Sequence, residues 1–303
     1  MTIGRRGFLK VVGASGALAG AAASTARAAT PAVAGDGGVE FNGMLIDTTM
    51  CIGCRACEAA CNEANQLPAP KVSFDSEAVF AERRDTTPDA FTVLNRFPNE
   101  KKPDEPTFVR RQCMHCNQPG CATACLVKAL EKTKEGPVVY NKDRCMGCRY
   151  CMIACPFDMP KYQYDSPLPY VRKCTFCAER QKQGLQPACA EACPTGATLF
   201  GKKRDLLEKA RARIQAEPDK YHHQIYGEHE AGGTGWLYLL PASPEKYGLP
   251  TNLGTTPYPE LTSGFLYGVP LVFVLWPSIL FGLNHMTRGR ENGEKGELHG
   301  DHD

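Results

Sequence analysis

Sixteen cysteines gathered in four compact groups constrain this 303-residue chain more than any other feature of its sequence. Each group opens with two cysteines separated by two residues and closes with two cysteines separated by three residues. No cysteine falls outside the groups, which are Cys51, Cys54, Cys57 and Cys61; Cys113, Cys116, Cys121 and Cys125; Cys145, Cys148, Cys151 and Cys155; and Cys174, Cys177, Cys189 and Cys193. Four thiolates in each group, with none missing or spare, predict four metal centres with cysteine ligands.

The first and third groups have the full spacing C-x2-C-x2-C-x3-C, and in the third group Pro156 follows the last cysteine. This run is typical of bacterial ferredoxins, in which three cysteines wrap one cluster and the fourth binds the other cluster. Gly53 and Gly147 lie inside these loops, where the lack of a side chain lets backbone N–H groups approach the sulfur atoms. The spacing therefore predicts four [4Fe–4S] clusters as cofactors.

Other uses of cysteine explain the pattern less well. A structural zinc site needs only two C-x2-C pairs, which gives no reason for the third, evenly spaced cysteine of the first and third groups. Cysteine makes up about 5% of the chain (16 of 303), which is below the density of disulfide scaffolds. Covalent haem needs C-x-x-C-H, and no histidine follows any of the C-x2-C pairs. A zinc-binding structural or assembly protein remains the alternative from a different functional class.

The N-terminus has the features of an export signal. Arg5 and Arg6 begin a twin-arginine pattern, although Gly4 stands where Ser or Thr is usual. A weakly apolar stretch follows, and Ala26–Ala28 match an A-x-A cleavage site. We expect residues 1–28 to be a signal peptide for the twin-arginine route, which exports folded proteins. Clusters could then be inserted before the thiols meet an oxidising compartment.

The C-terminus contains a candidate membrane span. From residue 261 to 286 there is no Asp, Glu, Lys or Arg, and the segment is long enough to cross a hydrocarbon core of about 30 Å. Its two prolines are tolerated in membrane helices, although a buried core helix remains the alternative. Arg288 and Arg290 follow at once, so the positive-inside rule places the polar tail, residues 287–303, in the cytoplasm. We expect a single-pass inner-membrane protein with its cysteines in the periplasm and a tail that is disordered from Glu291.

The charge balance is compatible with a chain that carries anionic clusters. Removing residues 1–28 takes away four basic and no acidic residues, which leaves 31 Lys and Arg against 33 Asp and Glu. Several basic residues adjoin cysteines and would offset the cluster charge locally: Arg55, Lys128, Arg149 and Lys173. His115 is expected to hydrogen-bond in the surroundings of a cluster rather than to bind a ligand. No run of basic and aromatic residues indicates nucleic-acid binding.

Short β-rich stretches and helical patterns alternate around the cysteine groups, in the β-α-β order of a ferredoxin-like unit. The strands are expected at 44–46, 107–109, 138–140 and 197–200, and the helices at 55–64 and 149–154. We therefore expect an α+β fold with a duplicated ferredoxin-like domain pair of the bacterial 2[4Fe–4S] type over residues 41–205. Residues 65–106 are expected to form an insertion loop. Residues 206–260 are expected to form an amphipathic helix, starting near Lys202, and an extended arm that leads to the transmembrane helix.

Three motifs make a resemblance specific: residues 112–116, 145–156 and 192–197. Together with the order of the groups and both ends, they resemble the four-cluster iron–sulfur subunits of membrane-bound respiratory oxidoreductases. The resemblance is strongest to the iron–sulfur subunit of hydrogenase-2-type complexes. It implies four ligand sets: Cys51, Cys54, Cys57 and Cys193; Cys174, Cys177, Cys189 and Cys61; Cys113, Cys116, Cys121 and Cys155; and Cys145, Cys148, Cys151 and Cys125. Proline is missing after Cys61 and Cys125, which leaves the loop shape there open.

The resemblance also implies a function. We expect a non-catalytic subunit that relays electrons between a periplasmic catalytic subunit, a hydrogenase, and a quinone-reactive integral membrane subunit. The alternative is the same role beside a molybdenum formate dehydrogenase or a thiosulfate or polysulfide reductase. In formate dehydrogenase relatives the export signal usually lies on the large subunit, so a signal on this chain favours hydrogenase. No catalytic residue is expected, because the polar cluster of His222, His223, Glu228, His229 and Glu230 fits no standard metal-binding spacing.

Overall fold

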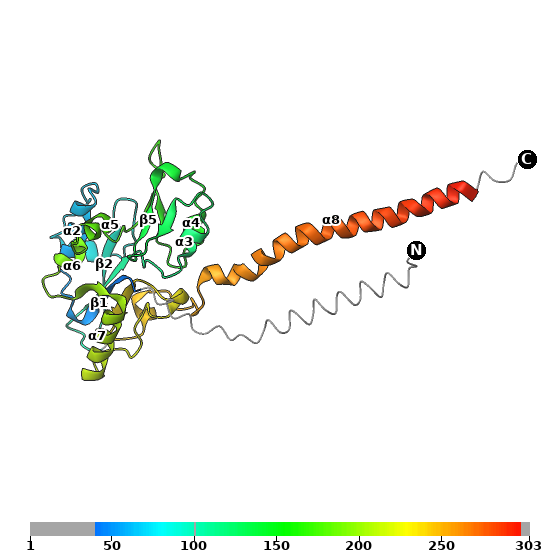
Figure 1. Cartoon of the computed structure of the whole chain (residues 1–303). Helices are drawn as coiled ribbons and strands as arrows, with labels where there is room; N and C mark the ends of the chain where they lie inside the picture. Colours follow the sequence, from blue (N-terminus) through cyan, green and yellow to red (C-terminus); the bar gives the residue numbers. More distant parts are fainter. Residues whose placement is uncertain (1–39, 100, 298–303) are drawn as a thin grey trace, which may run out of the picture. The chain divides into compact units, whose positions relative to one another are not determined.

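The computed structural model describes residues 40–99 and 101–297, so the expected signal peptide, residues 1–28, lies outside the described residues. Figure 1 shows the chain coloured along its sequence. The strands are β1 Asn42–Asp47, β2 Thr92–Phe97, β3 Thr107–Gln112, β4 Leu130–Lys132, β5 Val138–Tyr140, β6 Lys161–Tyr162, β7 Val171–Arg172, β8 Thr198–Lys202 and β9 Trp236–Leu239. The α-helices are α2 Ala56–Ala64, α3 Gly120–Thr123, α4 Tyr150–Ile153, α5 Ala178–Lys182, α6 Ala188–Glu191, α7 Lys203–Ala216 and α8 Tyr258–Glu297. Five 3₁₀ turns complete the described part: η2 Thr48–Met50, η3 Glu77–Phe80, η4 Lys142–Arg144, η5 Glu230–Gly232 and η6 Pro244–Tyr247.

A three-stranded sheet in the order β8-β1-β9 forms the centre of the described chain. β1 pairs antiparallel with β8 and parallel with β9, so that Met44 lies between Phe200 and Trp236. All four cysteine groups fall between β1 and β8 in sequence. The sheet therefore joins the chain before the first group to the chain after the last.

Both faces of this sheet are buried around β1 and β9, which explains why residues 44–46 and 236–239 are all apolar. On one face, side chains of β1 and β9 pack against α7 through Leu206 and Ala210; they are Leu45, Leu237 and Leu239. The other face packs against the cysteine region, including Cys113 and Cys189; its side chains are Met44, Ile46, Trp236 and Tyr238. The period-two alternation of the strands thus separates a helix layer from a cysteine layer.

The expected internal repeat is present in the backbone before the first and third cysteine groups. In both places a strand (β1 or β5) leads into a 3₁₀ turn (η2 or η4), then the cysteine loop, then a helix (α2 or α4). Asp47 and Asn141 accept a hydrogen bond from the second residue of their turns. Arg55 and Arg149 take the left-handed conformation before their helices, with φ of 59° and 60°. The backbone therefore follows the same local conformation at the first and third cysteine groups.

Two expectations about irregular segments were wrong. Within the expected insertion loop, 65–106, residues 92–97 form β2, which pairs antiparallel with β3 along its whole length. Within the expected arm, 217–259, β9 completes the central sheet, and Trp236 to Leu240 are almost completely buried. The compact body therefore extends well beyond residue 205, because the segment after α7 supplies an edge strand.

The apolar C-terminal segment forms α8. Residues 258–287 have the length needed to cross a membrane, and an 18-residue window within them has a mean hydropathy of 1.9 and is not buried in the described part of the chain. Within the described residues, α8 is therefore not a buried core helix. The first turn contacts the region of α3, where Gln118 Nε2 donates to Glu260 Oε1 at 3.1 Å. The helix continues to Glu297, so the tail is helical as far as that residue, contrary to the disorder expected from Glu291.

Candidate iron–sulfur site

The four cysteine groups share one backbone feature that identifies them as repeats. The residue before the second cysteine has a positive φ in every group: 78° at Gly53, 46° at His115, 73° at Gly147 and 54° at Phe176. This conformation costs non-glycine residues about 1–2 kcal/mol. His115 and Phe176 accept that cost while packing on each other, with ring centroids 5.0 Å apart. The loop shape is therefore required even where glycine is absent.

This conformation turns a backbone N–H group toward the first sulfur in three of the four loops. Phe176 N donates to Cys174 Sγ at 3.3 Å, and Gly147 N donates to Cys145 Sγ at 3.4 Å. Gly53 makes the corresponding contact to Cys51. The expected role of the loop glycines is thus present in the geometry, because N–H donors of this kind stabilise negative charge on sulfur.

The last cysteine of each group accepts a hydrogen bond from the residue four positions later. The donors are Ala129 N to Cys125 Sγ at 3.2 Å, Met159 N to Cys155 Sγ at 3.5 Å, Ala197 N to Cys193, and the side-chain amide of Asn65 to Cys61 Sγ at 3.6 Å. Cys61 differs because α2 continues past it to Ala64. The missing proline after Cys125 has no such effect, since Lys128 takes the same positive φ as Asp158 three residues after Cys155.

The sulfur atoms gather in four sets, two of which combine the first and fourth cysteine groups. Cys61 lies within electrostatic reach of three thiols of the fourth group: Cys174, Cys177 and Cys189. Cys51 is a neighbour of Cys57 and Cys193, and a small hollow is lined by Cys51, Cys54, Cys57 and Cys193 together. Neither set could be recognised from the spacing of one group alone.

The second and third cysteine groups exchange their last members in the same way. Cys116 is close to Cys113, Cys121 and Cys155. Cys151 is close to Cys125, Cys145 and Cys148. All sixteen cysteines suggested by the sequence therefore lie in one of four gatherings of thiols.

Three pairs of electrostatic neighbours link these sets into a row. Cys57 of the set with Cys51 neighbours Cys189 of the next. Cys174 of that set neighbours Cys113, and Cys121 neighbours Cys151. The sets therefore form a row that begins at the Cys51 set, passes through the Cys174 and Cys113 sets, and ends at the Cys145 set.

Burial sets the ionisation of these thiols. It raises the pKa of Cys51, Cys151 and Cys155 to about 11 and that of Cys121 to about 12, and neighbouring thiols add to the rise. Cys193 shows the opposite shift, because hydrogen bonds from Thr198 and Thr195 outweigh burial and lower its pKa. Gathered thiols of this kind ionise together only when a cationic metal core neutralises them.

The donor set fits an iron–sulfur cluster better than a single ion. Every one of the sixteen cysteines is a free thiol rather than part of a disulfide. Yet in the described part of the chain no three His, Cys, Asp or Glu side chains converge closely enough to hold one metal ion. Backbone N–H groups already point at several of these thiols. Sixteen free thiols with such donors match the ligands that four clusters need.

Buried cations adjoin the thiols, and sequence analysis missed the most enclosed of them. Arg110 is only 2% exposed and faces Cys57 and Cys189. The sequence feature that could have predicted its burial is the pair of consecutive arginines in an apolar strand. Side chains alternate between the two faces of a strand, so one of the two arginines must point inward. Lys173, which the sequence suggested, is also buried and donates to the carbonyls of Val138 and Cys174. By contrast, Arg55 pairs with Glu58 and not with a cysteine.

His115 is enclosed beside the thiols as expected. Its side chain is buried, and its Nδ1 accepts a hydrogen bond from Val138 N at 2.9 Å. Burial and the neighbouring Lys173 and Lys132 hold the pKa of His115 well below its ordinary value. The imidazole is therefore neutral and adds no charge to the site.

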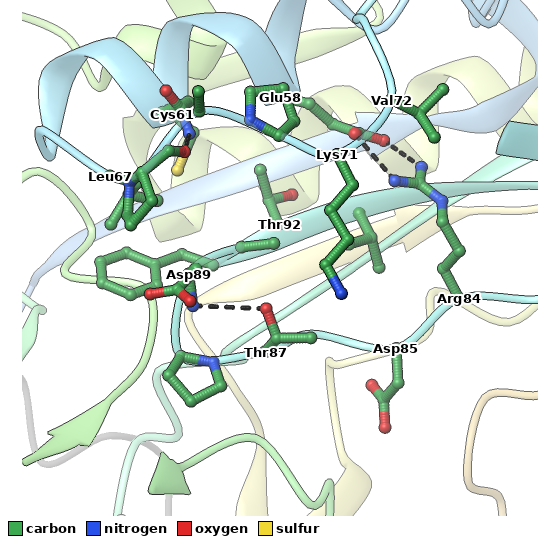
Figure 2. Close-up of a pocket in the computed structure, with 18 of the residues that line it drawn as sticks. Glu58, Cys61, Leu67, Lys71, Val72, Arg84, Asp85, Thr87, Asp89 and Thr92 are labelled. Carbon is green, nitrogen blue, oxygen red and sulfur yellow. Dashed lines mark hydrogen bonds and ion pairs between the residues drawn. The ribbon is translucent and has the colours of Figure 1, made fainter. Parts of the chain in front are cut away.

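The buried carboxylate of Glu58 joins α2, the helix of the first cysteine group, to strand β2. Glu58 of α2 accepts from Arg84 at 2.5 Å, from Arg55 at 3.0 Å and from Leu94 N at 2.6 Å. Figure 2 shows Arg84 reaching Glu58 at the edge of a cavity of about 870 Å³ between α2 and the segment that leads into β2. These bonds tie β2 to α2, which carries Cys57 and Cys61.

The two loop glycines differ in what surrounds them, which leads to a prediction. A Cβ added at Gly53 would lie 2.5 Å from the Phe108 ring, whereas at Gly147 the nearest atom is Tyr162 Oη at 3.1 Å. Both changes to alanine carry the cost of positive φ, but Gly53→Ala also displaces the loop that holds Cys51. We expect Gly53→Ala to lose about four irons per chain and Gly147→Ala to retain them, measured after anaerobic purification. Equal losses would mean that the Phe108 contact is irrelevant.

The polar residues between α7 and β9 do not gather into a second metal site. Glu230 is buried and accepts from Gly227 N at 2.6 Å and from Gln224 Nε2 at 2.8 Å. His229 Nε2 lies 3.8 Å from Glu228 Oε1 on the surface. The carboxylate of Glu230 therefore shapes a turn.

Comparison with known proteins agrees with this geometry. Two models described as 4Fe-4S dicluster domains match residues 50–129 and 105–203. A protein of Nitratidesulfovibrio vulgaris is 45% identical over 289 residues, which cover 95% of this chain and 78% of the relative. The hydrogenase-2 operon protein HybA of Escherichia coli O157:H7 is 31% identical over 333 residues, covering 97% of this chain and 99% of the relative.

The chain belongs to the family of 4Fe–4S dicluster iron–sulfur subunits. The same family includes the iron–sulfur subunit of the nitrate-inducible formate dehydrogenase of Escherichia coli K12, which is 36% identical over 69% of this chain and 72% of its own length. Two dicluster domains and sixteen cysteines fit four [4Fe–4S] clusters in this iron–sulfur subunit. The expected ferredoxin-type α+β fold and its cofactors are thereby confirmed.

Proposed function

We propose that this iron–sulfur subunit is a non-catalytic relay that carries electrons between a periplasmic hydrogenase and a quinone-reactive membrane subunit. The observation that carries the proposal is the row of four thiol sets, each within electrostatic reach of the next. When bound, a [4Fe–4S] cluster takes up and gives up single electrons, which is the chemistry that these residues serve. The protein fixes the spacing of the sites and the charge around them.

The proposed ligand sets cross between cysteine groups. One set is Cys51, Cys54, Cys57 and Cys193; the next is Cys174, Cys177, Cys189 and Cys61; the third is Cys113, Cys116, Cys121 and Cys155; and the last is Cys145, Cys148, Cys151 and Cys125. The electrostatic neighbours of Cys51, Cys61, Cys116 and Cys151 support these assignments. Crossing ties residues distant in sequence to one site, so that each pair of sites is held by both of its groups.

The two ends of the row reach the surface. Cys54 is exposed at one end beside Ile52, which is 62% exposed. Cys148 is exposed at the other end, among large apolar side chains that no part of the described chain covers: Leu126, Met146, Tyr150 and Ile153. The start of α8 contacts Gln118, which lies between Cys116 and Cys121 of the adjoining set, and this supports the membrane side of the row. We assign the Cys148 end to the membrane partner and the Cys54 end to the catalytic partner.

Hydrogenase is favoured as the catalytic partner by the HybA relative, whose alignment covers nearly all of both chains. The formate dehydrogenase subunit aligns over a smaller share, 69% of this chain. The same role in a molybdenum formate dehydrogenase, or in a thiosulfate or polysulfide reductase, is the alternative. Purifying the complex in mild detergent and identifying its largest subunit decides between them. A nickel–iron subunit supports the proposal, and a molybdenum subunit overturns the choice of hydrogenase.

Cofactor content tests the relay itself. The full chain, purified without oxygen, should contain about 16 irons and an equal amount of acid-labile sulfide. Dithionite should produce low-temperature EPR signals of reduced clusters. Stoichiometric zinc with no signal after reduction would instead support a structural or assembly protein.

The membrane arrangement gives a further prediction. We propose that residues 1–28 direct export by the twin-arginine route, that residues 261–286 cross the inner membrane, and that residues 287–303 lie in the cytoplasm. Changing Arg5 and Arg6 to lysine should leave the folded body in the cytoplasm, protected from protease added to spheroplasts, whereas the unaltered chain is digested. Protection of the unaltered chain would contradict a periplasmic body.

A further inference from the structure

Arg110 lies on the face of β3 that passes from one thiol set to the next. Alternation along β3 puts Phe108, Arg110 and Gln112 on this face. The Phe108 ring covers Gly53 in the first cysteine loop. Gln112 lines a small hollow with Cys61, Cys174 and Cys189. Arg110 is therefore positioned between the set that contains Cys57 and the set that contains Cys189.

Among the described residues, the guanidinium of Arg110 has no oxygen acceptor. All three of its nitrogens are buried without one, and its Cζ lies 4.9 Å from the centroid of the Trp236 ring. The acceptors it faces are the sulfur atoms of Cys57 and Cys189. Arg110 lines the same small hollow as Cys51, Cys57 and Cys193, so its charge is enclosed beside the thiols. A buried arginine without a carboxylate is stable only if other negative charge compensates it.

The neighbouring Arg111 provides a contrast on the opposite face of the strand. Its Nε lies 3.0 Å from Asp85 Oδ1, and its side chain is 26% exposed. Its charge is thus paired and partly solvated. Of these two consecutive arginines, Arg111 pairs with a carboxylate, whereas Arg110 faces the sulfur atoms of Cys57 and Cys189.

We propose that Arg110 is a positioning residue that bridges Cys57 of one cluster site and Cys189 of the next and raises the reduction potentials of both clusters together. The inference rests on the proposed relay. Each electron added to a cluster increases its negative charge, and a fixed cation in a dry interior stabilises that reduced state. Arginine keeps its proton throughout the accessible pH range, so the effect is constant with pH. The forked shape of its side chain allows simultaneous contact with two sulfurs.

The test is a potentiometric titration of the purified full chain, followed by low-temperature EPR. Arg110→Gln should lower two of the four midpoint potentials and leave the other two unchanged. We expect the reduction equilibrium of each affected cluster to fall at least tenfold, which is 59 mV for one electron. The matched control Arg111→Gln removes a charge from the same strand and should change none. Four unchanged potentials in Arg110→Gln, or the same shift in Arg111→Gln, overturn the inference.

A second variant separates bridging from charge alone and keeps the test valid if Arg110→Gln fails to assemble. Arg110→Lys keeps the charge, but an ammonium group is a compact point and reaches only one of the two sulfurs. We expect one potential to fall and its neighbour to stay near the unaltered value. Two unchanged potentials in Arg110→Lys overturn the bridge. Iron content separates a failure of the proposed relay from a failure of the Arg110 inference. An unaltered chain without iron refutes the relay. Unshifted potentials at full iron content refute only the role of Arg110.

Discussion

Replacing Cys61 with serine should remove one cluster, and that cluster should be the one built mainly by the fourth cysteine group. Iron is expected to fall from about 16 to about 12 per chain. The reason is that Cys61 neighbours Cys174, Cys177 and Cys189, while Cys51 neighbours Cys57 and Cys193. A serine at this position leaves one iron of the cluster without its thiolate.

Double variants make this expectation decisive. Adding Cys177→Ser to Cys61→Ser should cost nothing more, because both residues serve one cluster, and iron should stay at about 12 per chain. Adding Cys51→Ser instead should empty a second site and leave about 8 irons. If each sequence group held its own cluster, the two results would be reversed. A damaged site that keeps three irons would reduce the losses without changing their order.

Replacing Glu58 with alanine should destabilise the folded body by about 3–5 kcal/mol, because it leaves buried arginine charge without its partner. Glu58 is the common acceptor for Arg55, Arg84 and the backbone of Leu94, and its side chain is almost completely buried. For a protein of this size the thermal midpoint should fall by about 6–20 °C, followed by circular dichroism at cluster-saturating conditions.

Glu63 offers the matched control for this change. It lies on the same helix, α2, and is exposed. Glu63→Ala should change the stability by no more than about 0.5 kcal/mol. If both variants melt at the same temperature, the bonds across the cavity wall do not stabilise the first cysteine helix.

The cysteine spacing predicted the site because cluster ligation is encoded locally. A C-x2-C-x2-C-x3-C run demands a particular loop, and Gly53 and Gly147 have the positive φ that this loop needs. The second and fourth groups show the limit of that signal, since His115 and Phe176 adopt the same conformation without a glycine to reveal it. The strands and helices expected beside the cysteines are also present, including β1, β3, β8 and α2.

The elements that were missed depend on distant partners. Residues 236–240 are a short apolar run between glycine-rich and proline-rich segments, and periodicity alone does not distinguish such a run from an arm. It becomes β9 because β1 offers an edge, with Leu45 opposite Leu237. Arg110 was overlooked for a related reason. Its environment depends on Cys189, which lies far along the chain and is brought near only by folding.

The parallel pairing of β1 with β9 has a consequence for assembly during synthesis. The hydrogen bond from Thr48 Oγ1 to the Leu239 carbonyl joins positions 191 residues apart, so this seam closes only after almost the whole body has left the ribosome. Contacts of such long separation form slowly, because the entropy of closing the intervening loop must be overcome first. Until then Trp236 and Tyr238 cannot cover the cysteine layer. This side of the cysteine layer therefore stays uncovered until the chain has been synthesised beyond residue 239.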